Sequence, residues 1–249
     1  VAVPGAVAGY LQLQEQFGTL TRQQVLAPAI AIATEGFAVT PRYIGYVTKR
    51  LELLQQDPEI SRIFLVSSED GKFTAPKVGH QLKQPDLART LTLIAKEGAS
   101  VFYSGSVAQK LAQDIQARQG IITLEDLKSY GVRMRAPLVG SYRGHAIISS
   151  PPPSSGGQIL LTLLNIMETL PPKTPWRSAD ALHLYIEGSK RAFADRAFLG
   201  DPLFVAYVNK LVPLLIQKDR AELLAKIITN KAEAALNIPA GQGSATFPD

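Results

Sequence analysis

Residues 144–157 read GHAIISSPPPSSGG, and they join an expected strand to an expected helix. The apolar run within Gly144–Ser149 predicts the strand. The three prolines that follow end it, because proline has no N–H to donate to a sheet. Ser154 or Ser155 can then cap a helix that begins near Gly156, since a serine oxygen accepts a hydrogen bond from a free N–H of the first helical turn. The sequence therefore predicts a strand-to-helix joint at this point.

A second strand is expected just before the joint, at Ala136–Val139, and residues 140–143 (GSYR) are expected to form a hairpin turn. A weaker strand signal covers Ile63–Ser67. So few short strands cannot make a large sheet, and the apolar residues of a hairpin need a further layer to cover them. We therefore expect the chain to form part of a larger fold.

Apolar residues recur at steps of three and four through most of the chain, which is the period of helices. In the stretch Arg42–Leu54, for example, Ile44, Val47 and Leu51 share one face. The other helices are expected over Ala6–Phe17, Gln23–Thr34, Asp86–Lys96, Val107–Arg118, Gly157–Leu170, Ala179–Phe198 and Arg220–Thr229. The sequence predicts a predominantly helical α+β fold.

Side chains that favour helix starts support two of these assignments. Thr123 and Asp126 have the spacing of a capping box and predict a short helix over Leu124–Tyr130. Ser178 and Asp180 favour a start at Ala179, because their oxygens and early negative charge suit the free N–H groups there.

Composition excludes several classes of protein. The chain has 249 residues, of which 46% are hydrophobic, so it can form one globular unit or two small ones, and we expect one incomplete domain over residues 1–249. No apolar run reaches the roughly 18 residues of a transmembrane helix. The net charge of +5 is spread along the chain rather than clustered with aromatic residues, which disfavours nucleic-acid binding. Cysteine is absent, which excludes disulfides and a cysteine nucleophile.

The two serines of the joint are candidate nucleophiles, but a structural role is favoured for them. A serine nucleophile at Ser154 or Ser155 needs a general base and an orienting group, and no Gly-x-Ser-x-Gly motif is present. The histidines, His80, His145 and His183, do not have the spacing of a zinc site. Structural roles are therefore expected for the serines and for His145 and His183, and His80 is expected in an exposed loop.

Two carboxylates, Asp195 and Asp201, lie on either side of a helix end and could be read as an acid–base pair. An ion pair of Asp195 with Arg191 or Arg196 is the favoured interpretation. The residues alone thus predict no active site in this chain: no catalytic, substrate-binding or metal-binding residue is assigned, and no cofactor is expected.

Four strings of residues, in order, are similar to one family. They are PGAVAG at 4–9, GIITLEDL at 120–127, the stretch from Tyr142-Arg143-Gly144 through PPPSSGG at 151–157, and ADR at 194–196 with GDP at 200–202. In these strings the chain resembles the γ-glutamyltranspeptidases, over nearly its whole length.

The resemblance implies a segment of the large subunit of an N-terminal nucleophile hydrolase, whose fold is a four-layer α/β/β/α sandwich. Such enzymes are zymogens that cut themselves into two subunits by autoprocessing. The cut exposes a threonine that attacks γ-glutamyl amides such as glutathione, with the freed amine as base. Water, an amino acid or a peptide then accepts the γ-glutamyl group, so the enzyme is both a hydrolase and an acyltransferase in glutathione metabolism.

By the same resemblance, the catalytic groups are expected outside this chain. The nucleophile belongs to a Thr-Thr-His string of the small subunit, a context that Thr246 lacks, and the arginine that binds substrate belongs to a segment before Val1. The chain alone is expected to be inactive, to self-associate, to need the small subunit as its partner, and to come from a periplasmic or secreted protein.

Two alternatives remain open. One is a relative that acts on other substrates, either cephalosporin-acylase-like or capsule-processing. The other is a non-catalytic helical module that binds an anion at the amides of Gly156 and Gly157.

Overall fold

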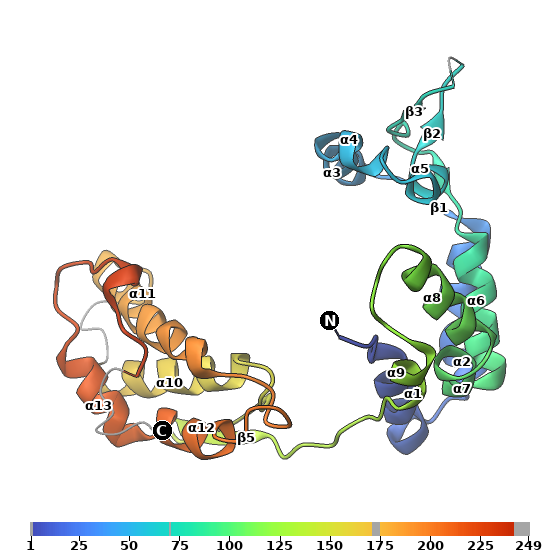
Figure 1. Cartoon of the computed structure of the whole chain (residues 1–249). Coiled ribbons are helices and arrows are strands. Elements are labelled where there is room, and N and C mark those ends of the chain that lie inside the picture. Colours follow the sequence, from blue (N-terminus) through green and yellow to red (C-terminus); the bar gives the residue numbers. More distant parts are fainter. Residues whose placement is uncertain (1, 70, 171–174, 242–249) are drawn as a thin grey trace. The chain divides into compact units, whose positions relative to one another are not determined.

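The computed structural model describes residues 2–69, 71–170 and 175–241, and the chain divides into two compact units, residues 1–133 and 134–249 (Figure 1). Both units are mainly helical and contain only short antiparallel strand pairs. The prediction of a predominantly helical α+β fold is confirmed. Every helix in the described parts of the chain is too short or too polar to cross a bilayer.

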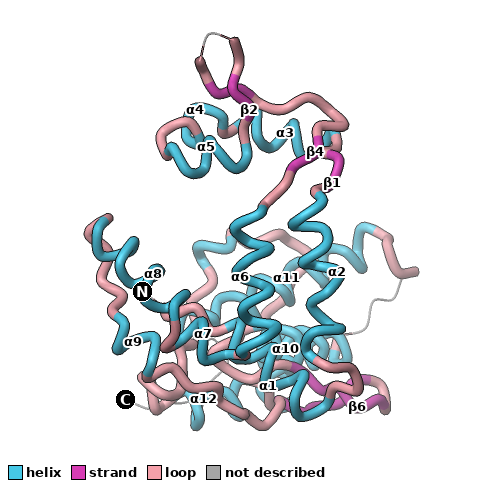
Figure 2. The backbone as a smooth tube through the Cα atoms, turned by 90° about the vertical axis from the view of Figure 1, so that its right-hand side faces the viewer, coloured by secondary structure: helices cyan, strands magenta, loops and turns pink. Residues whose placement is uncertain are grey.

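The N-terminal unit is built around the neighbouring helices α2 (Arg22–Glu35) and α6 (Pro85–Glu97), which lie side by side (Figure 2). A capping box of Thr21 and Gln24 begins α2. The remaining helices of this unit are α1 (Ala6–Phe17), α3 (Pro41–Lys49), α4 (Leu51–Leu54), α5 (Pro58–Phe64), α7 (Ala99–Tyr103), α8 (Ser106–Ala117) and α9 (Leu124–Lys128). Its strands are β1 (Phe37–Ala38), paired with β4 (Gln81–Leu82), and β2 (Val66–Ser67), paired with β3 (Phe73–Thr74).

Two apolar clusters hold this unit together. Leu11, Ile94 and Val101 bring together α1, α6 and α7. Ala108, Ala112, Ile122 and Leu127 bring α8 against α9. Buried aliphatic side chains of this kind are the main stabilising contribution to a small helical unit.

The C-terminal unit is organised around α10 (Gly156–Thr169). A hairpin of β5 (Leu138–Tyr142) and β6 (His145–Ser149) leads into it and packs on it, with Gly140 directly against Leu161. The other elements are α11 (Ala179–Ala194), the 3₁₀ turn η1 (Asp195–Phe198), α12 (Val208–Leu215), α13 (Lys218–Lys226) and the 3₁₀ turn η2 (Ala235–Asn237). Gly188 allows α11 to approach Leu163 and Ile166 of α10 closely.

Most predicted helices are confirmed to within about three residues at each end, but two predicted helices and one predicted strand differ from the structure. The helix expected over Arg42–Leu54 breaks at Arg50, whose N–H bonds the Val47 carbonyl in place of the helical i−4 partner. The helix expected over Ala179–Phe198 tightens into a 3₁₀ turn from Asp195. Ile63 and Phe64 of the expected strand Ile63–Ser67 belong to the end of α5, and only Val66–Ser67 is strand.

The hairpin is confirmed, but its turn lies elsewhere. The turn consists of Arg143 and Gly144, not residues 140–143, and β5 is correspondingly shifted from the expected Ala136–Val139. Both turn residues have positive φ, 47° and 80°. This is the backbone of the two-residue hairpin loop that best matches the twist of the strands.

Candidate functional site

The hydrogen bond that the serines make at the strand-to-helix joint of the C-terminal unit is to the local backbone. The Ser154 hydroxyl accepts a hydrogen bond from the Gly156 N–H at 3.3 Å, whereas Ser155, the residue at the cap position, makes no side-chain cap bond. Among the described residues, neither hydroxyl is bonded to a histidine or a carboxylate. The prediction that Ser154 or Ser155 bonds the start of this helix is confirmed by Ser154, and Ser155 makes no side-chain cap bond.

Gly157 is buried in this joint and lies directly against the chain at the end of β6. A Cβ atom at this position would lie 2.2 Å from the Ser150 carbonyl oxygen, which is far inside van der Waals contact. Close backbone approach therefore explains this glycine without any ligand.

The three histidines lie on different elements of the chain. His183, on α11, has Nε2 2.7 Å from the Thr229 carbonyl oxygen, which is a structural contact as expected. His145 is the exposed first residue of β6, and His80 lies exposed in the loop before β4. Residues 2–69, 71–170 and 175–241 contain no group of three or more potential ligands that could hold a metal ion.

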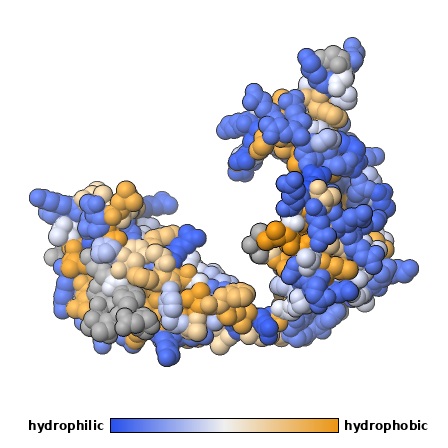
Figure 3. Space-filling view, viewed as in Figure 1, coloured by the Kyte–Doolittle hydropathy of each residue, from blue (hydrophilic) through white to orange (hydrophobic). Residues whose placement is uncertain are grey.

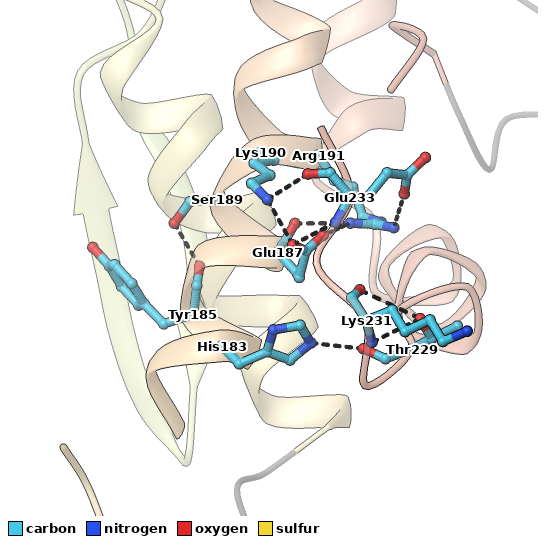
Figure 4. A network of polar contacts seen from close by, with 9 residues as sticks. All are labelled: His183, Tyr185, Glu187, Ser189, Lys190, Arg191, Thr229, Lys231 and Glu233. Atoms are coloured by element: carbon cyan, nitrogen blue, oxygen red, sulfur yellow. Dashed lines mark hydrogen bonds and ion pairs between the residues drawn. The ribbon is translucent and has the colours of Figure 1, made fainter. Parts of the chain in front are cut away.

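A buried polar network lies where α11 meets the chain after α13 (Figure 4). Glu187, only 1% exposed, is 2.6 Å from Lys190 Nζ and 3.0 Å from Arg191 Nη1. It also accepts the Glu233 N–H at 3.2 Å, and the Glu233 carboxylate pairs with Arg191 at 2.9 Å. Burial by itself raises the pKa of Glu187, but the hydrogen bonds from Lys190, Arg191 and the Glu233 N–H outweigh it and hold the pKa below its ordinary value.

A second buried ion pair lies at the end of α11. Asp195, also 1% exposed, receives two contacts of 2.9 Å from Arg220 on α13 and accepts the Gly241 N–H at 3.0 Å. Arg220 also donates to the Leu215 carbonyl at the end of α12. Burial raises the pKa of Asp195, and Arg220 and the Gly241 N–H oppose that rise.

The ion pair expected for Asp195 is present, but its expected partners are wrong. Arg191 is engaged by Glu187 and Glu233, and Arg196 is exposed, so the buried carboxylate meets Arg220, a residue far along the chain. Asp201 pairs separately with Arg135 at 2.9 Å and caps the Leu203 N–H. The two aspartates are thus held by different arginines.

Sequence reasoning missed Glu187, Arg220, Glu233 and Gly241. One signal was available for part of this set, because polar residues recur on α11 at steps of three and four: His183, Glu187, Lys190 and Arg191. No periodicity of α11 could have indicated residues 220, 233 or 241, which belong to other elements.

Comparison with known proteins finds one matching family and similar relatives that include a glutathione hydrolase and an acylase. A family model described as Gamma-glutamyltranspeptidase matches residues 1–246. A glutathione hydrolase proenzyme of Pseudomonas sp. (strain A14) is 38% identical, over 99% of this chain and 43% of its own length. An acylase ACY 1 proenzyme of Pseudomonas sp. (strain SE83) is 40% identical, over 90% of this chain and 40% of its own length. The chain therefore spans about two fifths of these curated relatives.

Two solved structures have the same fold over this region. The γ-glutamyltranspeptidase of Helicobacter pylori matches with a TM-score of 0.90 and 34% identity, covering 100% of this chain and 70% of that one. The cephalosporin acylase of Bacillus halodurans matches with a TM-score of 0.80 and 28% identity, covering 92% of this chain and 42% of that one.

Proposed function

The chain belongs to the γ-glutamyltranspeptidase family, and we propose that it is a scaffold portion of an enzyme that cleaves γ-glutamyl amides. The enzyme transfers the γ-glutamyl group to water, an amino acid or a peptide. The observation that carries this proposal is the family match over residues 1–246, supported by 34% identity and a TM-score of 0.90 to a γ-glutamyltranspeptidase structure. The chain covers part of its relatives only, so the activity belongs to the complete protein.

In the proposed mechanism the nucleophile is a threonine that begins a separate small subunit. Its hydroxyl oxygen attacks the γ-carbonyl carbon while its free α-amine takes the hydroxyl proton. The amide C–N bond breaks, the leaving amine takes up a proton, and a γ-glutamyl ester remains on the threonine. Water or an acceptor amine then attacks that ester, forms the product and returns the hydroxyl.

The role proposed for this chain is to support those groups. Its buried ionisable side chains are engaged with one another: Glu187 with Lys190 and Arg191, and Asp195 with Arg220. The Ser154 hydroxyl is bonded to backbone. Groups committed in this way stabilise a fold and are not free to act on a substrate, so we propose that residues 1–249 alone have no turnover.

The complete protein tests this proposal. We expect the full-length precursor to cut itself, with mass spectrometry showing a new chain that begins with threonine, and to release the chromophore of a γ-glutamyl anilide. Residues 1–249 purified alone should release none. Turnover by the short chain that survives repurification and is lost in Ser154→Ala or Ser155→Ala would refute the scaffold role and favour a serine nucleophile.

A second candidate substrate class is an acyl amide of the cephalosporin type. It is favoured by the 40% identity to an acylase and the TM-score of 0.80 to a cephalosporin acylase. Parallel assays of the mature protein on a γ-glutamyl anilide and on an acylated cephalosporin separate the two. A higher kcat/KM on the acylated cephalosporin than on the γ-glutamyl anilide would contradict the γ-glutamyl proposal and favour the acylase activity.

We also propose that the complete protein acts in the periplasm or outside the cell, which rests on the family resemblance. Fractionation of the source cells, with an antibody against residues 1–249, tests this. Retention in the cytosolic fraction would contradict it.

A further inference from the structure

The N-terminal unit carries a lobe between α2 and α6, which we define as residues 39–69 and 71–80. It contains α3, α4, α5 and the pair β2–β3, and these elements lie together beyond β1 and β4 (Figures 1 and 2). Tyr43 of α3 donates to a carbonyl of α5 at 3.3 Å, and Ser61 of α5 donates to a carbonyl of α4 at 3.1 Å. Gln55 donates to a carbonyl of β3 at 2.6 Å. The lobe is therefore held together by its own contacts.

The lobe is joined to α2 and α6 at one place. The chain enters it through β1 and leaves it through β4, and these two-residue strands pair with each other, Phe37 with Leu82 and Ala38 with Gln81. The two apolar clusters described above for this unit include no residue of the lobe. Two short strands side by side can serve as a pivot, because a few residues at the ends of elements can absorb the change in φ and ψ of a hinge motion.

Two ion pairs hold the two ends of α5 against the helices outside the lobe. Asp57, at the start of α5, accepts two N–H groups of the first turn with one oxygen, and its other oxygen lies 2.6 Å from Arg118 at the end of α8. Arg62, in the last turn of α5, is 2.8 Å from Asp86 in the first turn of α6. The lobe supplies the anion of one pair and the cation of the other, so both pairs form only when α5 has one orientation.

Both ion pairs are open to water. The side chains of Arg62 and Asp86 are 50% and 47% exposed, and that of Arg118 is 55% exposed. Exposed pairs are weak, and salt weakens them further, since the Debye length falls from about 10 Å at 0.1 M to about 3 Å at 1 M ionic strength. The backbone and side-chain hydrogen bonds inside the lobe involve no pair of opposite charges of this kind. The contacts that hold the lobe in place are thus more sensitive to salt than those that hold it together.

We propose that the lobe moves as a unit about β1 and β4, and that the pairs Asp57–Arg118 and Arg62–Asp86 are the latch that holds it closed. The closed state has both ion pairs, whereas the open state has neither and keeps the hydrogen bonds inside the lobe. Salt shifts the population toward the open state, because it weakens contacts that only the closed state makes. The inference concerns the position of the lobe and does not depend on the proposed function.

Pulsed electron paramagnetic resonance on the mature full-length protein tests this, with one spin label on the lobe and one on α8. Thr48 of α3 and Gln109 of α8 are exposed and uncharged. Residues 1–249 contain no cysteine, so Thr48→Cys/Gln109→Cys places both labels in this chain once any cysteine elsewhere in the protein is replaced by serine. The distribution of distances between the labels reports how many positions the lobe occupies.

Two double variants in the labelled protein separate the latch from charge in general. Arg62→Gln/Arg118→Gln, the latch variant, removes both ion pairs. Arg42→Gln/Arg50→Gln, the control variant, removes two exposed arginines of the lobe that have no ion pair with any described residue, and it changes the net charge by the same amount. Thermal unfolding of each labelled protein establishes that the distances come from folded molecules.

We expect wild type to show one main distance at 0.05 M NaCl and about fivefold more of a second distance at 1 M NaCl. The latch variant should show that second population already at 0.05 M, with little further response to salt, and the control variant should follow wild type. One unchanged distance in wild type at both salt concentrations would overturn the inference without any arginine variant. A salt response that persists in the latch variant, or a control variant that behaves like it, would also overturn it, because these ion pairs then do not hold the lobe.

Discussion

Glu187 is a buried carboxylate between two cations, and its stabilising effect should depend on pH. Its pKa is lowered in the folded chain, so the folded state favours the ionised form. This contribution is complete above the unfolded pKa of about 4.3 and is lost as the pH falls through the lower folded value. We expect Glu187→Gln to reduce the unfolding free energy by about 3 kcal/mol at pH 7, as when one partner of a buried pair is removed. The difference from wild type should shrink below about pH 4.

A matched control is Glu222→Gln on the exposed side of α13. Urea unfolding at pH 7 and at about pH 3 should show a change within about 0.5 kcal/mol for this variant at both values. A Glu187→Gln effect that is equally small, or one that grows on acidification, would contradict the role of the buried charge.

At the scale of single residues, the sequence predicted which groups are structural better than it predicted their partners. His183 and Ser154 have the backbone contacts expected of them. For Asp195, local spacing offered Arg191, which lies about one helical turn away, and Arg196, which is the next residue in the chain. Burial determines the partner instead: Arg196 is exposed on η1, whereas the Asp195 carboxylate is buried and meets Arg220.

At the scale of elements, the start of α10 carries two serines with different expected effects. Ser154 accepts from the Gly156 N–H, and Ser155 makes no side-chain cap bond. We expect Ser154→Ala to cost about 0.5–1 kcal/mol, the usual effect of losing a helix-start hydrogen bond, and Ser155→Ala to cost less than half of that. Chemical denaturation of both variants measures this, and a larger loss for Ser155→Ala would show that the cap is assigned to the wrong residue.

The two glycines after these serines form a second matched pair. A Cβ on Gly157 would meet the Ser150 carbonyl at 2.2 Å, whereas a Cβ on Gly156 meets nothing closer than the Ser154 hydroxyl at 3.5 Å. Gly157→Ala forces the strand and helix apart, and we expect a loss of about 2–3 kcal/mol. Gly156→Ala should change stability by at most about 0.5 kcal/mol. Equal midpoints of unfolding for the two variants would contradict the close contact.

The hairpin shows why the position of an element is harder to predict than its existence. Gly140 and Gly144 both look like turn residues, and the sequence does not say which one is needed elsewhere. Gly140 packs directly against Leu161 of α10, where a Cβ atom would not fit. The turn is therefore formed by Arg143 and Gly144. That requirement comes from packing between elements that are separated in sequence, so a local pattern does not contain it.

At the scale of the whole molecule, long periodic helices and the family were predictable, whereas short elements were not. The helices α5, α7 and α12 were missed because five to eight residues give too few repeats to establish a period. The position of the boundary between the two compact units was also not predicted, since no Pro/Gly/Ser-rich linker marks residues 133–134. The joint at 151–157 and the strings matched to the family were predictable because they combine unusual residues in fixed order.

Apolar side chains reach the surface in both units (Figure 3), and the clearest case is the hairpin. Val139 and Ile148 are directly paired across β5 and β6, yet they are 61% and 70% exposed. On α11, Leu182, Ile186 and Phe193 are exposed as well. The chain spans about two fifths of the length of the curated relatives it matches.

We therefore expect purified residues 1–249 to self-associate at micromolar concentration and to bind a hydrophobic dye, because a contiguous apolar surface favours burial against a second copy. Light scattering coupled to gel filtration gives the mass, and dye fluorescence reports the exposed surface. Val139→Thr/Ile148→Thr replaces two apolar side chains with residues that also favour strands, so it should lower both signals while the hairpin remains. Leu161→Thr is the contrasting variant: it disrupts the core beneath the hairpin and should raise dye binding. A compact wild-type monomer that binds no dye would contradict the expectation that residues 1–249 expose an apolar surface that favours self-association.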